Sequence, residues 1–269
     1  GYESLAGYLE DAYYMGATIG RFANRIADAS FTIDRKTFHL EANDGNNTNH
    51  GGFSGFHNKV WQWEELPDGI RFSLYSPDGE GGFPGNIRVI TDYRFNEDNE
   101  LSVRHYAETD CATYINMTNH AYFNLCGKGK KITEHRLHIP ADRILDTTPA
   151  FIPTGKRMNV KNTPFDFTSL KPIGTDLYAD HEQLLWNKGY NHCYILKDEI
   201  SVEMLEAASL YEPVTGRKMT VMTDLPAVLL YTAGYYERPD TAVCLETQFY
   251  PDTPSHSDFP SCLVLPEKA

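Results

Sequence analysis

The sequence predicts an all-β protein, a large antiparallel β-sandwich with very little helix. Many short segments alternate apolar and polar residues, as in residues 87–95, where Ile87, Val89 and Thr91 alternate with charged side chains. Turn signals rich in Pro, Gly and Asp separate these segments, and helical periodicity is rare. Long helical segments between the strands are absent, so a parallel βαβ sheet is not expected.

The strand signals recur from one end of the chain to the other. Each is three to nine residues long and bounded by turn residues, the usual pattern of an antiparallel sandwich or barrel. The expected strands are "SFTI" (30–33), "VWQWEEL" (60–66), "IRFSLYS" (70–76), 87–95, 101–103, "RKMTVMT" (217–223), "AVLLYT" (227–232) and "AVCLETQFY" (242–250), with turns at "PDG" (67–69), "PDGEGGFPG" (77–85) and "PDTP" (251–254).

Only two short segments show a helical pattern, "RFANRIAD" (21–28) and "HEQLLWN" (181–187). No internal repeat, linker or change of composition marks a domain boundary. A single domain over residues 1–269 is therefore expected.

Composition and charge exclude several classes of partner. The chain is 41% hydrophobic and 23% charged, typical of a globular protein, and its formal net charge is −13. Such a field repels phosphate backbones and anionic lipid, so neither nucleic acid nor a membrane surface is an expected partner. No apolar run is long enough to cross a bilayer.

The five cysteines favour a reduced, cytoplasmic protein. Their number is odd, none forms a Cys-x-x-Cys pair, and a chain of 269 residues does not need disulfides for stability. Cys244 lies in an apolar strand and is expected to be a small core residue. The chain opens at Gly1, not Met, inside patterned sequence and without a signal peptide, so a missing start and a lost export signal both stay open.

Glu246 is the first candidate for chemistry. In "AVCLETQFY" the alternation places Cys244, Glu246 and Gln248 on one face of a strand and Val243, Leu245 and Thr247 on the other. A carboxylate in such a position either faces solvent or lies in a pocket. Burial would raise its pKa toward neutrality, which suits a general base.

His120 is the second candidate. In "INMTNHAYFNL" (115–125) a strand that begins at Thr113 would present His120 on the polar face together with Asn116 and Thr118. A histidine placed in this way either hydrogen-bonds to a neighbouring strand or transfers protons near neutral pH.

Two further segments carry weaker signals. His50 precedes the pair Gly51 and Gly52, which lets the backbone pass close to a ligand or to another strand. Arg25 follows Asn24, and a guanidinium beside an amide either clamps hydroxyls and carboxylates or pairs with a surface acid.

Cofactor and metal sites are not expected. His135 and His138, the closest histidines that could form a pair, lie in a strand-like segment that would point them to opposite faces. The chain also lacks a glycine-rich phosphate loop and a serine in a nucleophile elbow.

Taken together, the motifs resemble the aldose 1-epimerase (galactose mutarotase) family. They occur in order over nearly the whole chain: "GRFANRI" (20–26), "NHGGFSGFHNKVW" (49–61), "NMTNHAYFNL" (116–125), "TPFDF" (163–167), "GYNHCYIL" (189–196) and "CLETQFYPD" (244–252).

The resemblance implies the galactose mutarotase-like supersandwich and the interconversion of α and β anomers of a hexose of galactose or glucose type. It implies that Glu246 removes the proton of the C1 hydroxyl while His120 protonates the ring oxygen, with the roles reversed on ring closure. The environments of the two groups must then hold opposite protonation states at one pH. It further implies sugar contacts from Asn24, Arg25, His50, Tyr122 and Asn191, with no cofactor or metal.

Two positions depart from the family pattern. Asn191 stands where the family usually has aspartate, and Leu229 where it often has glutamine, so the sugar contacts differ while the acid–base pair is kept. The family also has strands before Gly1 and after Ala269, so the domain is expected to lack terminal strands. A monomer or homodimer is expected.

Three alternatives remain. The first is a non-catalytic carbohydrate-binding relative, favoured by Asn191 and Leu229. The second is a glycosidase, which needs a second carboxylate about 5–10 Å from Glu246, with Asp166 and Asp252 as candidates. The third is an epimerase for a modified sugar, which would need a basic cluster beyond Arg25.

Overall fold

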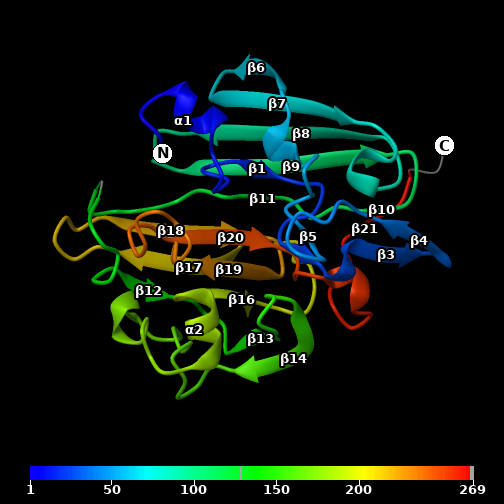
Figure 1. The fold of residues 1–269 in the computed structure, drawn as a ribbon. Helices are drawn as coiled ribbons and strands as arrows, with labels where there is room; N and C mark the ends of the chain where they lie inside the picture. The colour runs from blue at the N-terminus through cyan, green and yellow to red at the C-terminus, as the bar shows by residue number, and fades with distance from the viewer. Residues whose placement is uncertain (128, 267–269) are drawn as a thin grey trace. The chain divides into compact units, whose positions relative to one another are not determined.

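The computed structural model describes residues 1–127 and 129–266, and its chain is folded mainly into strands (Figure 1). Two compact units are distinguished: the first comprises Gly1–Thr18 and Thr118–Pro260, and the second comprises Ile19–Met117 with residues 261–266. The single domain over residues 1–269 stays a prediction. The all-β class is confirmed, because the described residues contain just two short α-helices.

The first unit contains two antiparallel sheets. One has five strands in the order β14-β13-β16-β19-β20, and the other has four in the order β15-β12-β17-β18. Apolar side chains from both sheets, such as Ile144, Leu210 and Val228, belong to one buried cluster, which holds the sheets together. The elements are α1 (Leu5–Leu9), β11 (Thr118–Asn119), β12 (Arg136–His138), β13 (Arg143–Thr147), β14 (Pro153–Asn159), β15 (Lys171–Pro172), α2 (Glu182–Asn187), β16 (Asn191–Ile195), β17 (Leu205–Tyr211), β18 (Lys218–Thr223), β19 (Ala227–Tyr231) and β20 (Cys244–Gln248), with 3-10 turns at Ile173–Thr175 and Thr253–Ser255.

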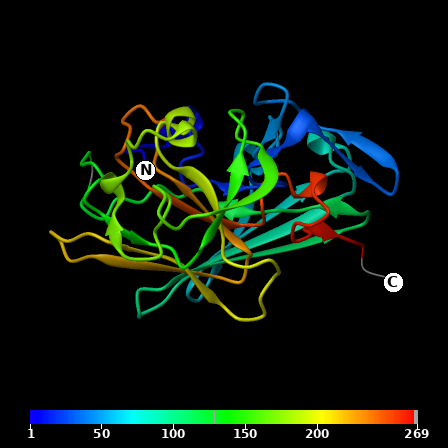
Figure 2. The same ribbon diagram turned by 90° about the horizontal axis from the view of Figure 1, so that it is seen from below.

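The second unit is built around the antiparallel sheet β6-β7-β8-β9. Its apolar residues Phe56, Ile87, Val89 and Ile115 form a separate buried cluster. A hairpin of β3 and β4, blue in Figure 2, and the pairs β2-β5 and β10-β21 complete it. The strands are β2 (Arg25–Ile26), β3 (Ser30–Ile33), β4 (Lys36–His39), β5 (Thr48–Asn49), β6 (Gln62–Leu66), β7 (Gly69–Ser76), β8 (Ile87–Phe95), β9 (Leu101–Thr109), β10 (Thr113–Tyr114) and β21 (Leu263–Val264), with 3-10 turns at Ala27–Ala29, Phe56–Asn58 and Glu80–Gly82; β1 (Thr18–Ile19) spans the sequence boundary between the units.

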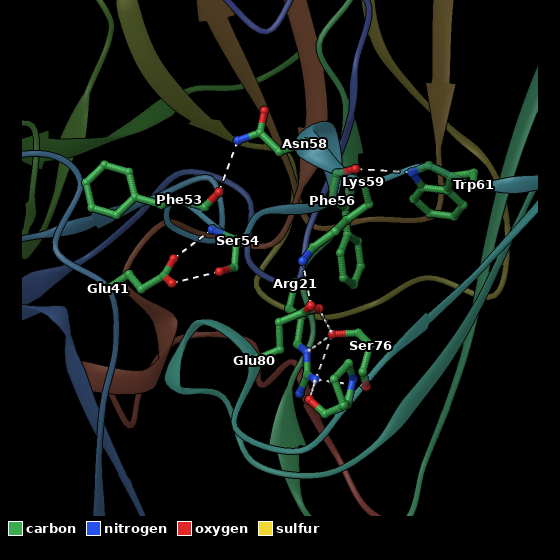
Figure 3. A network of polar contacts seen from close by, with 11 residues as sticks. Arg21, Glu41, Phe53, Ser54, Phe56, Asn58, Lys59, Trp61, Ser76 and Glu80 are labelled. Atoms are coloured by element: carbon green, nitrogen blue, oxygen red, sulfur yellow. Dashed lines mark hydrogen bonds and ion pairs between the residues drawn. The ribbon is translucent and has the colours of Figure 1, made fainter.

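Arg21 is a buried cation in the second unit, 2% exposed (Figure 3). Its guanidinium donates to the hydroxyl and carbonyl of Ser76 and to the carbonyls of residues 77 and 83–85, at distances from 2.8 to 3.5 Å. The Ser76 hydroxyl in turn donates to Glu80, which pairs with Lys59. Burial lowers the pKa of Arg21 to about 10, so the group stays charged at neutral pH. These hydrogen bonds hold the loop between β7 and β8, residues 77–86, in one conformation.

Most expected strands are present, but two expectations were wrong. Residues 21–28 form no helix: β2 and a 3-10 turn occupy this segment, and Asn24 has a φ of 64°, which an α-helix does not allow. The strand expected to run from Thr113 to His120 is interrupted between β10 and β11, where Asn116 instead bonds to the backbone of Arg21 and Ala23. The helix expected at 181–187 is confirmed as α2.

No helix in the described ranges is both long enough and apolar enough to pass through a bilayer.

Candidate functional site

Glu246 lies in the middle of β20, on the sheet face predicted for it, and is 1% exposed. Its cross-strand neighbour is Leu229 in β19, which in turn pairs with Cys193 in β16. The alternation of the strand places Cys244 and Gln248 on the same face. Of the two interpretations of Glu246, burial excludes a solvated sheet face and supports a lined site.

His120 is held beside this face by its own backbone. Its N–H donates to the carbonyl of Ala17, and its carbonyl accepts from the N–H of Gly16, both at 2.9 Å. The side chain is 5% exposed, and its Nε2 lies 3.5 Å from Oε1 of Glu246. The structure thus brings the two predicted proton-transfer groups together inside the first unit.

Aromatic rings surround the imidazole of His120. Tyr122 stacks on it with ring centroids 5.1 Å apart, and Tyr14 stacks at 5.9 Å. Tyr231 contacts it edge-on at 6.4 Å. The rings therefore restrain the orientation of the imidazole.

Tyr122 was predicted to contact sugar, and a hydrogen bond fixes the position of its hydroxyl. Its hydroxyl donates to the carbonyl of Tyr13 at 2.8 Å, which leaves the oxygen lone pairs to accept further bonds. Burial raises the pKa of Tyr122 well above its ordinary value, and neighbouring Cys244 adds to this shift. Tyr122 is therefore a neutral phenol at physiological pH.

Cys244 contacts the other ring nitrogen of His120. Its Sγ lies 3.8 Å from Nδ1, and the thiol is fully buried. Burial raises the pKa of the Cys244 thiol far above its usual range, and Glu246 contributes to the increase. The residue expected to be a simple core cysteine thus touches the candidate acid.

Asn191 is the first residue of β16 and pairs with Tyr231, which pairs with Cys244. These three residues form the row next to the Cys193–Leu229–Glu246 row, so the Asn191 side chain shares the face of Glu246. Its backbone N–H donates to Nδ1 of the buried His192. Both departures from the family pattern, Asn191 and Leu229, accordingly lie on the same sheet face as Glu246.

The other predicted sugar contacts, Asn24, Arg25 and His50, come together in the second unit. The N–H of Asn24 donates to Nδ1 of His50, and the N–H of His50 donates to the carbonyl of Asn24. The amide oxygen of Asn24 accepts from the N–H of Arg25. Nε of Arg25 lies 2.7 Å from the carboxylate of Asp44. Of the two roles considered for Arg25, this nitrogen has the one of pairing with an acid.

The glycine beside His50 makes room for backbone. A Cβ at Gly51 would lie 2.1 Å from the carbonyl oxygen of Gly20, and Gly51 has a φ of 85°. Of the two roles considered for the glycine pair, close approach of another chain segment is the one observed.

Sequence reasoning missed three contributors to the site. Tyr14 and Tyr231 line the His120 ring, and Cys244 engages Nδ1. The alternation in "CLETQ" already placed Cys244 on the face of Glu246, so this signal was available. Nothing local marked Tyr14, because it lies 106 residues before His120 in the sequence and only the folded chain brings the two rings together.

Comparisons with known proteins identify the family of the chain. The aldose 1-epimerase family profile matches residues 1–269. The galactose mutarotase of Rattus norvegicus is 37% identical over 278 residues, covering 99% of this chain and 79% of the relative. The aldose 1-epimerase of Escherichia coli K12 is 35% identical over 272 residues, covering 96% and 78%.

Two solved structures are similar throughout. An aldose epimerase homologue from C. elegans has a TM-score of 0.89 and 26% identity, covering 100% of this chain and 83% of its own. A galactose 1-epimerase from Lactobacillus acidophilus has a TM-score of 0.85 and 27% identity, covering 98% and 79%. These similarities confirm the predicted mutarotase-like β-sandwich.

The fold and the relatives thus define a sugar isomerase of the mutarotase type. The chain belongs to the aldose 1-epimerase family.

Proposed function

We propose that this protein interconverts the α and β anomers of a hexose of galactose or glucose type, using Glu246 as the base and His120 as the acid. The observation that carries the proposal is the 3.5 Å separation of His120 Nε2 and Glu246 Oε1, with both side chains buried. The C1 hydroxyl and the ring oxygen are bonded to the same carbon, so their base and acid must lie close together.

The reaction begins with ring opening. Glu246 takes the proton of the C1 hydroxyl while the His120 imidazolium gives a proton to the ring oxygen, and the bond from C1 to the ring oxygen breaks. The aldehyde rotates about the C1–C2 bond and presents its other face. On closure Glu246 returns its proton to the carbonyl oxygen and His120 removes the proton from the attacking hydroxyl. Each transfer contributes about 10²–10⁴-fold to the rate.

The sugar contacts are assigned on the same basis. Asn24, Arg25, His50 and Asn191 supply hydrogen bonds to hydroxyls or to the ring oxygen, and Tyr122 accepts through its phenol oxygen. The reciprocal bonds between Asn24 and His50 fix the geometry of that pair before sugar arrives. Preorganised polar groups of this kind orient a small ligand.

We also propose a cytoplasmic enzyme, monomeric or homodimeric, that uses no cofactor. The five cysteines support the location, because each is a free thiol in the structure.

Polarimetry on freshly dissolved α-D-galactose and α-D-glucose tests the proposal. The protein should accelerate relaxation to the anomeric equilibrium, and Glu246→Gln should lower kcat by about 10²–10⁴-fold because the amide cannot accept the proton. A folded Glu246→Gln variant with wild-type activity would overturn the assignment of the base.

One alternative retains a specific observation in its favour. Leu229 faces Glu246 and Asn191 lies on the same sheet face, so a carbohydrate-binding relative without turnover is the second candidate. Calorimetric binding of galactose without any acceleration of mutarotation would favour it.

The glycosidase alternative needs a second carboxylate, and Asp166 was one candidate. Its carboxylate accepts hydrogen bonds from the N–H and the hydroxyl of Thr168, which fits a structural role in a turn. Release of sugar from an aryl glycoside is the deciding assay.

A further inference from the structure

The imidazole of His120 has a different neighbour at each nitrogen. Nε2 faces the carboxylate of Glu246 at 3.5 Å, and Nδ1 faces the thiol of Cys244 at 3.8 Å. Cys244 and Glu246 are two residues apart in β20 and therefore lie on the same face of the strand, so a single strand supplies both neighbours. Stacking by Tyr14 and Tyr122 restrains the ring in this orientation.

The sulfur is a hydrogen-bonding partner of an unusual kind for a catalytic histidine. Because burial keeps the Cys244 thiol protonated, it adds no second negative charge next to Glu246. A thiol sulfur is a weak acceptor compared with a carboxylate oxygen. It can accept a hydrogen bond from Nδ1–H while stabilising the imidazolium much less than an aspartate would.

This difference matters for the proton donor. The ring oxygen of a sugar is weakly basic, and a histidine whose charged form is strongly stabilised is a poorer acid toward it. A weak partner at Nδ1 orients the ring and keeps the imidazolium a competent acid. The tautomer of a histidine is set by the bond that its other nitrogen makes.

We propose that Cys244 is a positioning residue for His120: its sulfur accepts the Nδ1–H bond, so that Nε2 is the nitrogen that exchanges the proton with the sugar. On ring opening the Nε2–H bond breaks and an O–H bond forms at the ring oxygen, while Nδ1 keeps its proton. The neutral imidazole then has a free lone pair at Nε2, which can take a proton back on closure. The catalytic part of this inference rests on the proposed function, whereas the tautomer does not.

The tautomer is measured directly by nitrogen-15 NMR of protein labelled at histidine, with His120 assigned from the signals lost in His120→Gln. In Glu246→Gln, where no carboxylate competes for the proton at Nε2, the neutral ring should show a protonated Nδ1 and an unprotonated Nε2. Cys244→Ala should move the ring toward the Nε2–H tautomer, and Cys244→Ser should lie between the two because a hydroxyl can also accept the bond.

Kinetics supply the second readout. Cys244→Ala should lower kcat by about tenfold, the lower end of what outer partners of functional histidines contribute, with KM little changed. Cys244→Ser should recover part of the loss. Cys193→Ala is the matched control, because Cys193 is a buried thiol on the same sheet face whose neighbours are apolar. It should leave kcat and the His120 tautomer unchanged.

A Glu246→Gln ring protonated at Nε2, or a tautomer in that variant that Cys244→Ala does not alter, would overturn the proposal. So would an equal loss of kcat in Cys193→Ala, because the effect would then be one of packing. If the wild-type protein does not accelerate mutarotation, the proposed function fails. The NMR comparison then still decides whether Cys244 sets the tautomer of His120.

Discussion

Arg21 and His120 are both buried and polar, but their surroundings differ in the number and the length of their polar contacts. Arg21 in the second unit makes seven hydrogen bonds, mostly to backbone carbonyls that cannot move away. At His120 in the first unit, the Glu246 carboxylate lies 3.5 Å from Nε2 and the Cys244 sulfur lies 3.8 Å from Nδ1, both longer than usual hydrogen bonds between nitrogen and oxygen. The many bonds to Arg21 hold a loop in place, whereas His120, which exchanges a proton in the proposed reaction, is flanked by aromatic rings and by the Cys244 sulfur.

The largest effect is expected from breaking the Arg21 network. Arg21→Met should lower the free energy of unfolding by about 3–5 kcal/mol, because it removes one side of a buried polar network and leaves the carbonyls near Ser76 and residues 83–85 without their donor. Urea unfolding followed by circular dichroism measures the change.

Two controls make that comparison sharp. Arg94→Met removes a guanidinium that pairs with Asp68 at the exposed surface, and should cost less than about 1 kcal/mol. Glu246→Gln should leave the free energy of unfolding nearly unchanged while abolishing most activity. If Arg21→Met were as mild as Arg94→Met, the distinction between the two regions would be lost.

A smaller effect is expected from restoring the family residue at Asn191. Asn191→Asp should lower KM by about fivefold, since a bond to a charged acceptor is worth about 1 kcal/mol more than a bond to a neutral one. The value of kcat should stay the same, because Asn191 does not touch the transferred protons. Polarimetry over a range of sugar concentrations separates the two constants, with Asn191→Ala as the variant that should raise KM. A change in kcat alone would argue against a role in binding.

The smallest effect concerns Asp92 on the sheet β6–β9. Hydrogen bonds from Arg71, and then from Arg94, hold the pKa of this carboxyl below its usual value. A depressed pKa in the folded state gives stability that is present above the unfolded pKa of about 3.9 and is lost as the pH falls through the folded value. Asp92→Asn should therefore lower Tm at pH 7, and the difference from wild type should shrink below about pH 4.

Thermal unfolding at several pH values measures this difference. Asp68→Asn is a suitable control, because Asp68 is exposed and forms its ion pair with Arg94 at the surface. A difference for Asp92→Asn that stays constant from pH 7 to pH 3 would show that the lost interaction is not the ionic one.

Much of the fold was predictable because strand alternation is local. Residues 30–33 and 87–95 are strands with the expected bounds, and the segment 242–250 contains β20 with Glu246 facing as predicted. Short helical periodicity was less reliable. It was correct for α2 but wrong for residues 21–28, where Asn24 takes a positive φ and exchanges bonds with His50.

The site was predictable in part for the same reason. The sequence determined which face of β20 carries Cys244 and Glu246, because successive side chains of a strand must point to opposite sides. It could not determine that His120, 124 residues before Cys244, would place one nitrogen on that sulfur and the other on Glu246. That arrangement depends on contacts between segments far apart in the chain, and only the tertiary structure decides which of them meet.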